Sequence, residues 1–272
     1  MGVLEAIILG IVQGLTEFLP ISSSGHLILT RELFGIAGES ALAFDAVLHF
    51  ATALAVLIYF WKDIVNLAGS FLNWILRRPI EATQLRMLIA IIVATIPAVL
   101  LGLLLEGYLE TVFRNPLLVV VALIVGSAII WGAEWMYKRN ELIVSEVVPS
   151  GKSALLIGFF QSLALIPGMS RSGMAMSGGM LLGLSREDAT RFAFLLAVPL
   201  LLGAGAKKLL ELSENGVLFA DSVALAAGAA SAFIVGLFVI HYLLKFVRTH
   251  SLMVFVWYRL LLAVFALAVL YI

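Results

Sequence analysis

The sequence predicts an all-α integral membrane protein with six transmembrane helices plus two re-entrant helical hairpins in an inverted-topology repeat. Three observations predict this class: the composition, the lengths of the apolar segments and a motif that occurs twice. Of the 272 residues, 62% are hydrophobic and 12% are charged, with a mean hydropathy of +1.12. A soluble chain carries about 25% charged residues, so this chain has too little polar surface for a water-soluble globule.

Charge and cysteine content exclude several function classes. The 17 basic and 17 acidic side chains balance, so no net charge points to nucleic acid as a partner. The chain has no cysteine, which excludes disulfides, thiolate metal sites and cysteine nucleophiles.

Six apolar segments are long enough to cross a bilayer, because about 20 helical residues span a hydrocarbon core of ~30 Å. They cover roughly residues 41–61, 85–105, 116–137, 189–206, 223–244 and 252–272. Residues 63–76 have apolar side chains at helical spacing, which predicts a helix along the inner membrane interface.

Two other apolar stretches are interrupted before they can span. Residues 3–19 end at Pro20, residues 154–166 end at Pro167, and each is followed by a Ser/Gly-rich turn. A second short helical piece comes next, over 24–33 and 173–182. Broken backbone survives at membrane depth only where it lines a cavity, so we expect re-entrant hairpins.

The two interrupted stretches share a pattern. Gly25 follows Gln13 by twelve residues, and Gly173 follows Gln161 by twelve. Each copy precedes three predicted spans, and an odd number of spans turns the second copy upside down. We expect one membrane domain, 1–272, with repeat A over about 1–137, repeat B over about 153–272, and a site where the broken segments meet.

The distribution of basic residues predicts the orientation. If the N-terminus lies outside, eleven Lys and Arg fall in inner segments and four in outer segments. The inner ones are Lys62, Arg77, Arg78, Arg86, Lys138, Arg139, Lys152, Arg186, Arg191, Lys245 and Arg248, and the outer ones are Arg31, Arg114, Lys207 and Lys208. Because cytoplasmic loops carry an excess of Lys and Arg, both termini are predicted outside.

Polar side chains of the first interrupted stretch are candidate site residues, since charges within a membrane are costly. Gln13 and Glu17 share one helix face and suit Mg²⁺ or Ca²⁺ held jointly with phosphate. Ser23 and Ser24 fall at the N-terminus of the next helix, where free N–H groups bind anions, and His26 lies in its first turn.

The second stretch supplies the matching groups. Ser170, Arg171 and Ser172 fall at the equivalent helix N-terminus, and the guanidinium fork of Arg171 suits phosphate. Two helix N-termini and one arginine predict a site for a multiply charged oxyanion. Simpler interpretations stay open: the serines cap a helix, Glu17 pairs with an arginine across the repeat interface, and His49 belongs either to the core or to the surroundings of the site.

The sequence also resembles a known family. Residues 13–26, QGLTEFLPISSSGH, resemble the (E/Q)xxxE plus SS-[ST]-G-H signature of undecaprenyl-diphosphate phosphatases of the bacitracin-resistance type. Residues 167–173, PGMSRSG, resemble that family's PGxSRS motif, and the similarity extends along the chain. The resemblance implies six spans plus two re-entrant hairpins, and removal of the terminal phosphate of a polyprenyl diphosphate with a divalent cation. It further implies that this recycles the lipid carrier for cell-envelope glycan synthesis, in the plasma membrane, at a site open to the outer face.

The resemblance also implies residue roles. Gln13 and Glu17 would serve metal binding and catalysis, Ser23 would be the nucleophile, His26 the acid–base group and Arg171 the diphosphate-binding arginine. The remaining substrate-binding candidates are Ser24, Ser170 and Ser172. The chain departs from the family at Ala175, where a threonine is common.

Alternatives remain at this point. Ser23 attacks with His26 accepting its proton, or a metal-bound water attacks directly. The alternative function class is a membrane transporter or flippase for lipid phosphate or a small anion, because inverted repeats with broken helices are common in carriers. The sequence also leaves open whether the protein forms a homodimer.

Overall fold

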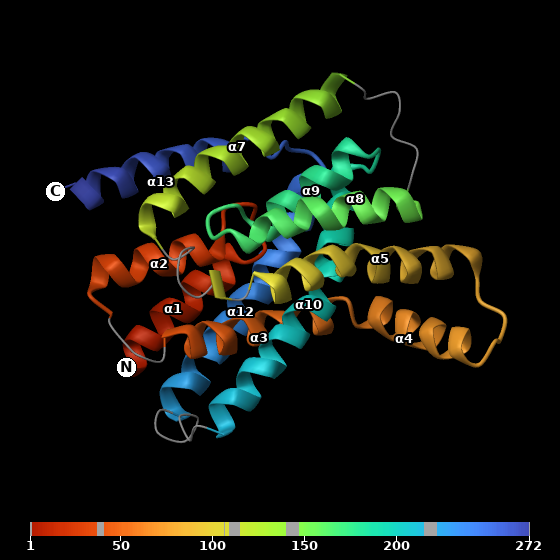
Figure 1. Ribbon diagram of the computed structural model, residues 1–272, viewed down its shortest axis with the longest axis horizontal. Coiled ribbons are helices and arrows are strands. Elements are labelled where there is room, and N and C mark those ends of the chain that lie inside the picture. The colour runs from red at the N-terminus through yellow and green to blue at the C-terminus, as the bar shows by residue number, and fades with distance from the viewer. Residues whose placement is uncertain are drawn as a thin grey trace.

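The computed structural model describes residues 2–36, 41–105, 107–108, 115–139, 147–214 and 222–271, which form helices and turns without a strand (Figure 1). The helices are α1 (Val3–Thr16), α2 (Ser23–Phe34), α3 (Ala41–Tyr59), α4 (Trp61–Ile75), α5 (Ala82–Leu104), α7 (Pro116–Arg139), α8 (Gly151–Ser162), the 3₁₀ helix η3 (Leu163–Leu165), α9 (Arg171–Leu181), α10 (Arg186–Glu214), α12 (Ser222–Val247) and α13 (Met253–Tyr271). The all-α prediction is confirmed for this part of the chain.

Among the described residues, four helices are long and apolar enough to cross a membrane: α5, α7, α12 and the segment Arg186–Lys207 of α10. A fifth span is possible by length only if α3 and α4 are joined, but these helices meet at an angle of 87°. The structure therefore supports four to five of the six predicted spans by length and composition. The predicted helix over 63–76 is present as α4 (Trp61–Ile75), turned sharply away from α3.

Both interrupted stretches are broken helices. We call residues 17–22, between α1 and α2, the first break, and residues 163–170, between α8 and α9, the second break. Pro20 and Pro167 lie inside them, where the absence of a backbone N–H prevents a continuous helix. Helix α9 is enclosed on all sides, since every residue from Ser172 to Met180 is buried.

Close helix packing holds the two broken helices in place. A Cβ on Gly10 of α1 would lie 2.3 Å from the carbonyl oxygen of Gly228 in α12. A Cβ on Gly158 of α8 would lie 2.5 Å from the carbonyl oxygen of Ala94 in α5. Only glycine permits these approaches, which bring α1 against α12 and α8 against α5.

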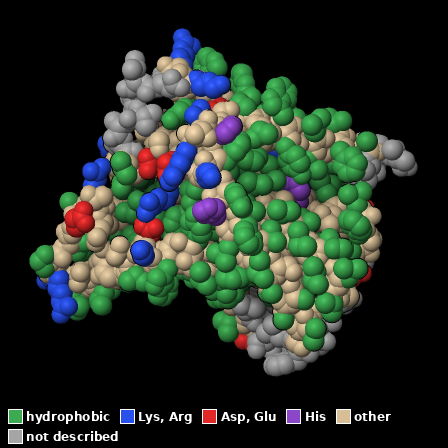
Figure 2. Space-filling view, turned by 180° about the vertical axis from the view of Figure 1, so that it is seen from behind, with side chains coloured by type: hydrophobic (Ala, Val, Ile, Leu, Met, Phe, Trp, Pro, Cys, Tyr) green, Lys and Arg blue, Asp and Glu red, His purple; other side chains and the backbone are tan. Residues whose placement is uncertain are grey.

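The molecule has two distinct ends. The N- and C-termini lie at the same end (Figure 1). Most of the Lys and Arg side chains on the face in Figure 2 gather at the opposite end, while hydrophobic side chains cover the rest of that face. This separation has the form that the positive-inside rule predicts for an even number of crossings.

Candidate active site

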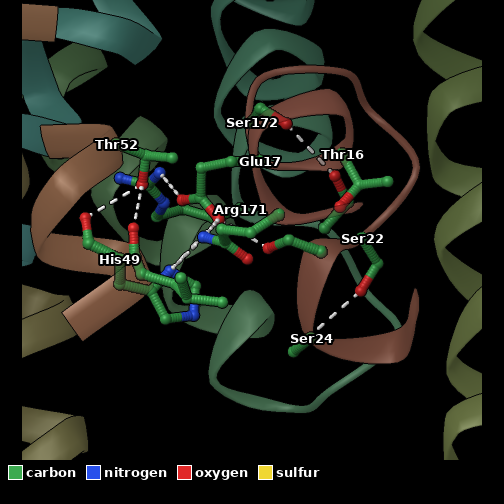
Figure 3. Close-up of polar contacts among 12 residues, drawn as sticks. Thr16, Glu17, Ser22, Ser24, His49, Thr52, Arg171 and Ser172 are labelled. Atoms are coloured by element: carbon green, nitrogen blue, oxygen red, sulfur yellow. Dashed lines mark hydrogen bonds and ion pairs between the residues drawn. The ribbon is translucent and has the colours of Figure 1, made fainter. Parts of the chain in front are cut away.

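The two breaks meet at the carboxylate of Glu17, the C-cap residue of α1 (Figure 3). Ser23 Oγ donates a hydrogen bond to Glu17 Oε2 at 2.5 Å, and Gln13 Nε2 donates to the same oxygen at 2.9 Å. Arg171 Nη2 donates to the other oxygen, Oε1. Glu17 is 5% exposed, so a buried carboxylate joins the first residue of α2 to the first residue of α9.

His49 of α3 also belongs to this cluster (Figure 3). Its Nδ1 lies 3.2 Å from Glu17 Oε2 and 2.9 Å from Gln13 Nε2. Sequence analysis left His49 between the core and the surroundings of the site, and the structure places it in contact with the predicted site residues. The polar groups around the Glu17 carboxylate favour its ionised form, which only accepts hydrogen bonds. They belong to Gln13, Ser23, His49 and Arg171.

Two polar atoms of the cluster have no hydrogen-bond partner within the described ranges. They are Arg171 Nη1, a donor, and Gln13 Oε1, an acceptor, and both are buried. The ion pair of Glu17 with Arg171 alone would satisfy the simpler interpretation of a structural link between repeats. The buried, unpaired Nη1 of Arg171 is not explained by that link. Such a donor costs free energy unless a ligand pairs with it, so it indicates a ligand site.

The N-termini of α2 and α9 have the same local conformation. The N-cap residues Ser22 and Ser170 have φ of 75° and 73°, and each Oγ accepts from the backbone N–H three residues later. Non-glycine residues rarely adopt positive φ, so the backbone is strained at both serines, and the surrounding contacts hold it in this conformation. Each cap leaves the earlier N–H groups of its helix available for an anion.

Direct hydrogen bonds tie the breaks together. Gly168 N donates to Ser22 Oγ at 3.1 Å, and Ser172 Oγ donates to the carbonyl oxygen of Leu19 at 2.9 Å. Of the predicted substrate-binding serines, Ser170 is thus a helix cap, whereas Ser24 and Ser172 lie within the first turns of α2 and α9.

His26 is oriented differently from the prediction. Its Nδ1 lies 2.7 Å from the carbonyl oxygen of Ser22, and its Nε2 lies 2.8 Å from the hydroxyl of Tyr258. Both ring nitrogens are therefore engaged away from Ser23, whose hydroxyl faces Glu17 instead. The expectation that His26 accepts the Ser23 proton does not match this arrangement, because the turn after Pro20 directs Ser23 back toward α1.

Arg259 of α13 was not singled out from the sequence. It is fully buried, and it donates to the carbonyl oxygens of Pro20 at 3.3 Å and Gly168 at 2.8 Å, one in each break. It also donates to Ser127 Oγ at 3.0 Å in α7. The signal that could have found it is an arginine inside an apolar segment, where a charge is costly without a function.

The residues present fit a divalent cation only together with substrate oxygens. Within the described ranges, no group of three or more His, Asp or Glu side chains is arranged to hold a metal. Glu17 and Gln13 supply hard oxygen donors, and the buried Oε1 of Gln13 has no partner in the described part of the chain. Mg²⁺ is commonly held by one or two carboxylates plus phosphate oxygens, which agrees with this donor set.

Comparison with known proteins gives a consistent result. A family model described as bacitracin resistance protein BacA matches residues 6–265. A protein of Pelotomaculum thermopropionicum named undecaprenyl-diphosphatase is 43% identical over 270 residues, covering 98% of this chain and 97% of the relative. Proteins of the same name from Pelobacter propionicus and Moorella thermoacetica are 40% and 41% identical. These alignments cover 96% and 99% of this chain, and 94% and 98% of the relatives.

Proposed function

Because this chain belongs to the family of the bacitracin resistance protein BacA, we propose that it is a membrane undecaprenyl-diphosphatase. It hydrolyses undecaprenyl diphosphate to undecaprenyl phosphate and inorganic phosphate, and so recycles the carrier lipid for cell-envelope glycan synthesis. The apolar tail lies in the bilayer while the diphosphate enters the cluster around Glu17.

One observation carries the proposal: only one of the two terminal guanidinium nitrogens of Arg171 has a partner among the described residues. Its Nη2 binds Glu17, while its buried Nη1 lacks a partner in the described part of the chain. A phosphate oxygen would complete that donor without breaking the ion pair. The free N–H groups at the starts of α2 and α9 would then stabilise charge on the equatorial oxygens, which is most of what phosphoryl transfer requires.

The contacts of Ser23 support a role for Glu17 as its proton acceptor. In the first step Ser23 Oγ attacks the terminal phosphorus, undecaprenyl phosphate leaves, and the Ser23 proton passes to Glu17 Oε2. In the second step water attacks the phosphoserine, and Glu17 returns the proton to Ser23 as the P–O bond breaks. We assign to His26 the proton that this water loses. Direct attack of water on the terminal phosphorus, without a phosphoserine, is the competing route.

We propose that Glu17 and Gln13 hold Mg²⁺ or Ca²⁺ together with the diphosphate. The unpartnered Gln13 Oε1 supports this assignment among the described residues. Such an ion would supply positive charge that offsets the charge of the diphosphate. Without it, Glu17 still orients Ser23 and Arg171, and Gln13 still orients Glu17.

The finer membrane arrangement is also a proposal: six crossings, two re-entrant hairpins, both termini outside and the site open to the outer face. Matching N-caps at Ser22 and Ser170, and matching glycine contacts at Gly10 and Gly158, support an inverted repeat. The separation of basic side chains from the termini supports the orientation (Figures 1 and 2). The names of the relatives and the Ser23–Glu17 pair favour an enzyme over a transporter, since a carrier needs no activated hydroxyl.

Phosphate release from undecaprenyl diphosphate by the purified protein tests the function. We expect EDTA-sensitive release, and a loss of at least about 100-fold in Arg171→Lys, because lysine lacks the planar fork that presents one nitrogen to Glu17 and another to a phosphate oxygen. Arg248→Lys is the matched control, since Arg248 forms an exposed ion pair with Glu187. No release by the wild-type protein, or equal activity of Arg171→Lys and Arg248→Lys, would refute the proposal.

A further inference from the structure

His26 is held at both ring nitrogens, and the two contacts define its protonation. A carbonyl oxygen can only accept, so the 2.7 Å contact with Ser22 requires that Nδ1 carries a proton and donates it. In the neutral ring Nε2 is then an acceptor with a single lone pair. The hydroxyl of Tyr258, 2.8 Å away, donates to it.

Tyr258 is the more accessible member of this pair. Tyr258 is 43% exposed and His26 is 8% exposed. The two rings lie nearly parallel, with an interplanar angle of 4° and centroids 5.6 Å apart. Among the described residues, the charged side chain that interacts electrostatically with the His26 ring is Arg259, which follows Tyr258 on α13.

We infer that Tyr258 is a positioning residue for His26 and also the group through which a proton reaches it. The attacking water gives a proton to Tyr258 Oη while the Oη proton passes to Nε2, so Tyr258 stays neutral and His26 becomes charged. The charged ring then donates to Tyr258 Oη, because the hydroxyl can rotate to accept. The inference rests on the proposed function, which gives His26 a proton to accept.

The chain offers a matched control for this contact. Tyr59 of α3 also forms a hydrogen bond with a histidine, at 3.1 Å between its hydroxyl and Nδ1 of His241, on an exposed surface. Tyr258→Phe and Tyr59→Phe each remove one hydroxyl that contacts one histidine. Only the first removes a contact with a residue of the proposed reaction.

Kinetics give the first test. We expect Tyr258→Phe to lower kcat about tenfold with unchanged KM, because the substrate does not bind Tyr258 directly. In a His26→Gln background the same change should alter kcat by less than about twofold, since the two residues act as a unit. Tyr59→Phe should match the wild type. An unchanged kcat in Tyr258→Phe, or losses that multiply fully in the double variant, would overturn the inference.

A spectrum that needs no turnover separates this inference from the function. In protein with ¹⁵N-labelled histidine, the four histidines include His26, which a His26→Gln variant identifies. We expect a proton on Nδ1 of His26 and a shift of the Nε2 signal in Tyr258→Phe but not in Tyr59→Phe. An unshifted Nε2 signal overturns this inference alone, whereas absence of phosphate release by the wild type overturns the proposed function.

Discussion

Alanine substitutions at the adjacent serines Ser22 and Ser23 should affect different properties: Ser22→Ala should lower stability, and Ser23→Ala should lower turnover. Ser22 Oγ accepts from Gly25 N at 3.4 Å and from Gly168 N at 3.1 Å, so Ser22→Ala removes a helix cap and a link between the breaks. A cap is worth about 0.5–2 kcal/mol and an orphaned buried amide about 1–3 kcal/mol. We therefore expect the free energy of unfolding to fall by about 3 kcal/mol.

Ser23→Ala removes one hydrogen bond from Glu17, which keeps Gln13, His49 and Arg171 around it. The free energy of unfolding should change by no more than about 1 kcal/mol. Loss of the nucleophile should lower turnover at least about 10³-fold, which corresponds to roughly 4 kcal/mol in the barrier.

Thermal unfolding in detergent and phosphate release from undecaprenyl diphosphate measure the two effects separately. Ser170→Ala is the control for the cap alone, because Ser170 Oγ caps α9 through Gly173 N as Ser22 Oγ caps α2, and it should lose only the cap contribution of about 0.5–2 kcal/mol. Ser22→Gly should lose about 1 kcal/mol less than Ser22→Ala, since glycine tolerates the φ of 75°. A Ser23→Ala variant with near wild-type turnover, or a Ser22→Ala variant with unchanged stability, would refute the reasoning.

Three further predictions concern Arg259, the metal and the membrane topology. Arg259→Met leaves the two break carbonyls unpaired and should lower the free energy of unfolding by about 4 kcal/mol in denaturation experiments, while Arg259→Lys should cost less; equal stability of Arg259→Met and wild type would contradict this. Gln13→Met should raise the Mg²⁺ or Ca²⁺ concentration needed for half-maximal phosphate release, and activity that is insensitive to EDTA would remove the metal assignment. Single cysteines at Glu32 and Arg78, in a chain without any cysteine, should react with an impermeant reagent from outside only at position 32; labelling of both from one side would contradict the topology.

Much of the fold could be predicted because its signals are local. Pro20 and Pro167 mark the two breaks, and the serines that follow them are the N-caps that the structure shows. The amphipathic pattern over 63–76 predicted α4, and the structure adds that it turns from α3 by 87°. That angle has no local signal, since neither proline nor glycine occurs between Tyr59 and Trp61.

The site residues could be predicted more easily than their pairing. Intramembrane charge selected Glu17 and Arg171, and the serine run at a helix N-terminus selected Ser23; the structure brings the three together. Sequence spacing suggested that Ser23 faces His26, one turn along α2, but the positive φ of Ser22 turns Ser23 toward Glu17. Arg259 contacts a break 239 residues earlier in the chain, and no local pattern encodes such a contact.

The pairing of Ser23 with Glu17 is the central claim, and a double-mutant cycle tests it most directly. Phosphate release would be measured for Ser23→Ala, Glu17→Gln and the double variant, each shown to be folded by its thermal unfolding. If Glu17 acts by accepting the Ser23 proton, the double variant should be no slower than the slower single variant, within about threefold. Losses that multiply in full would show that the two residues act independently, and would contradict the account.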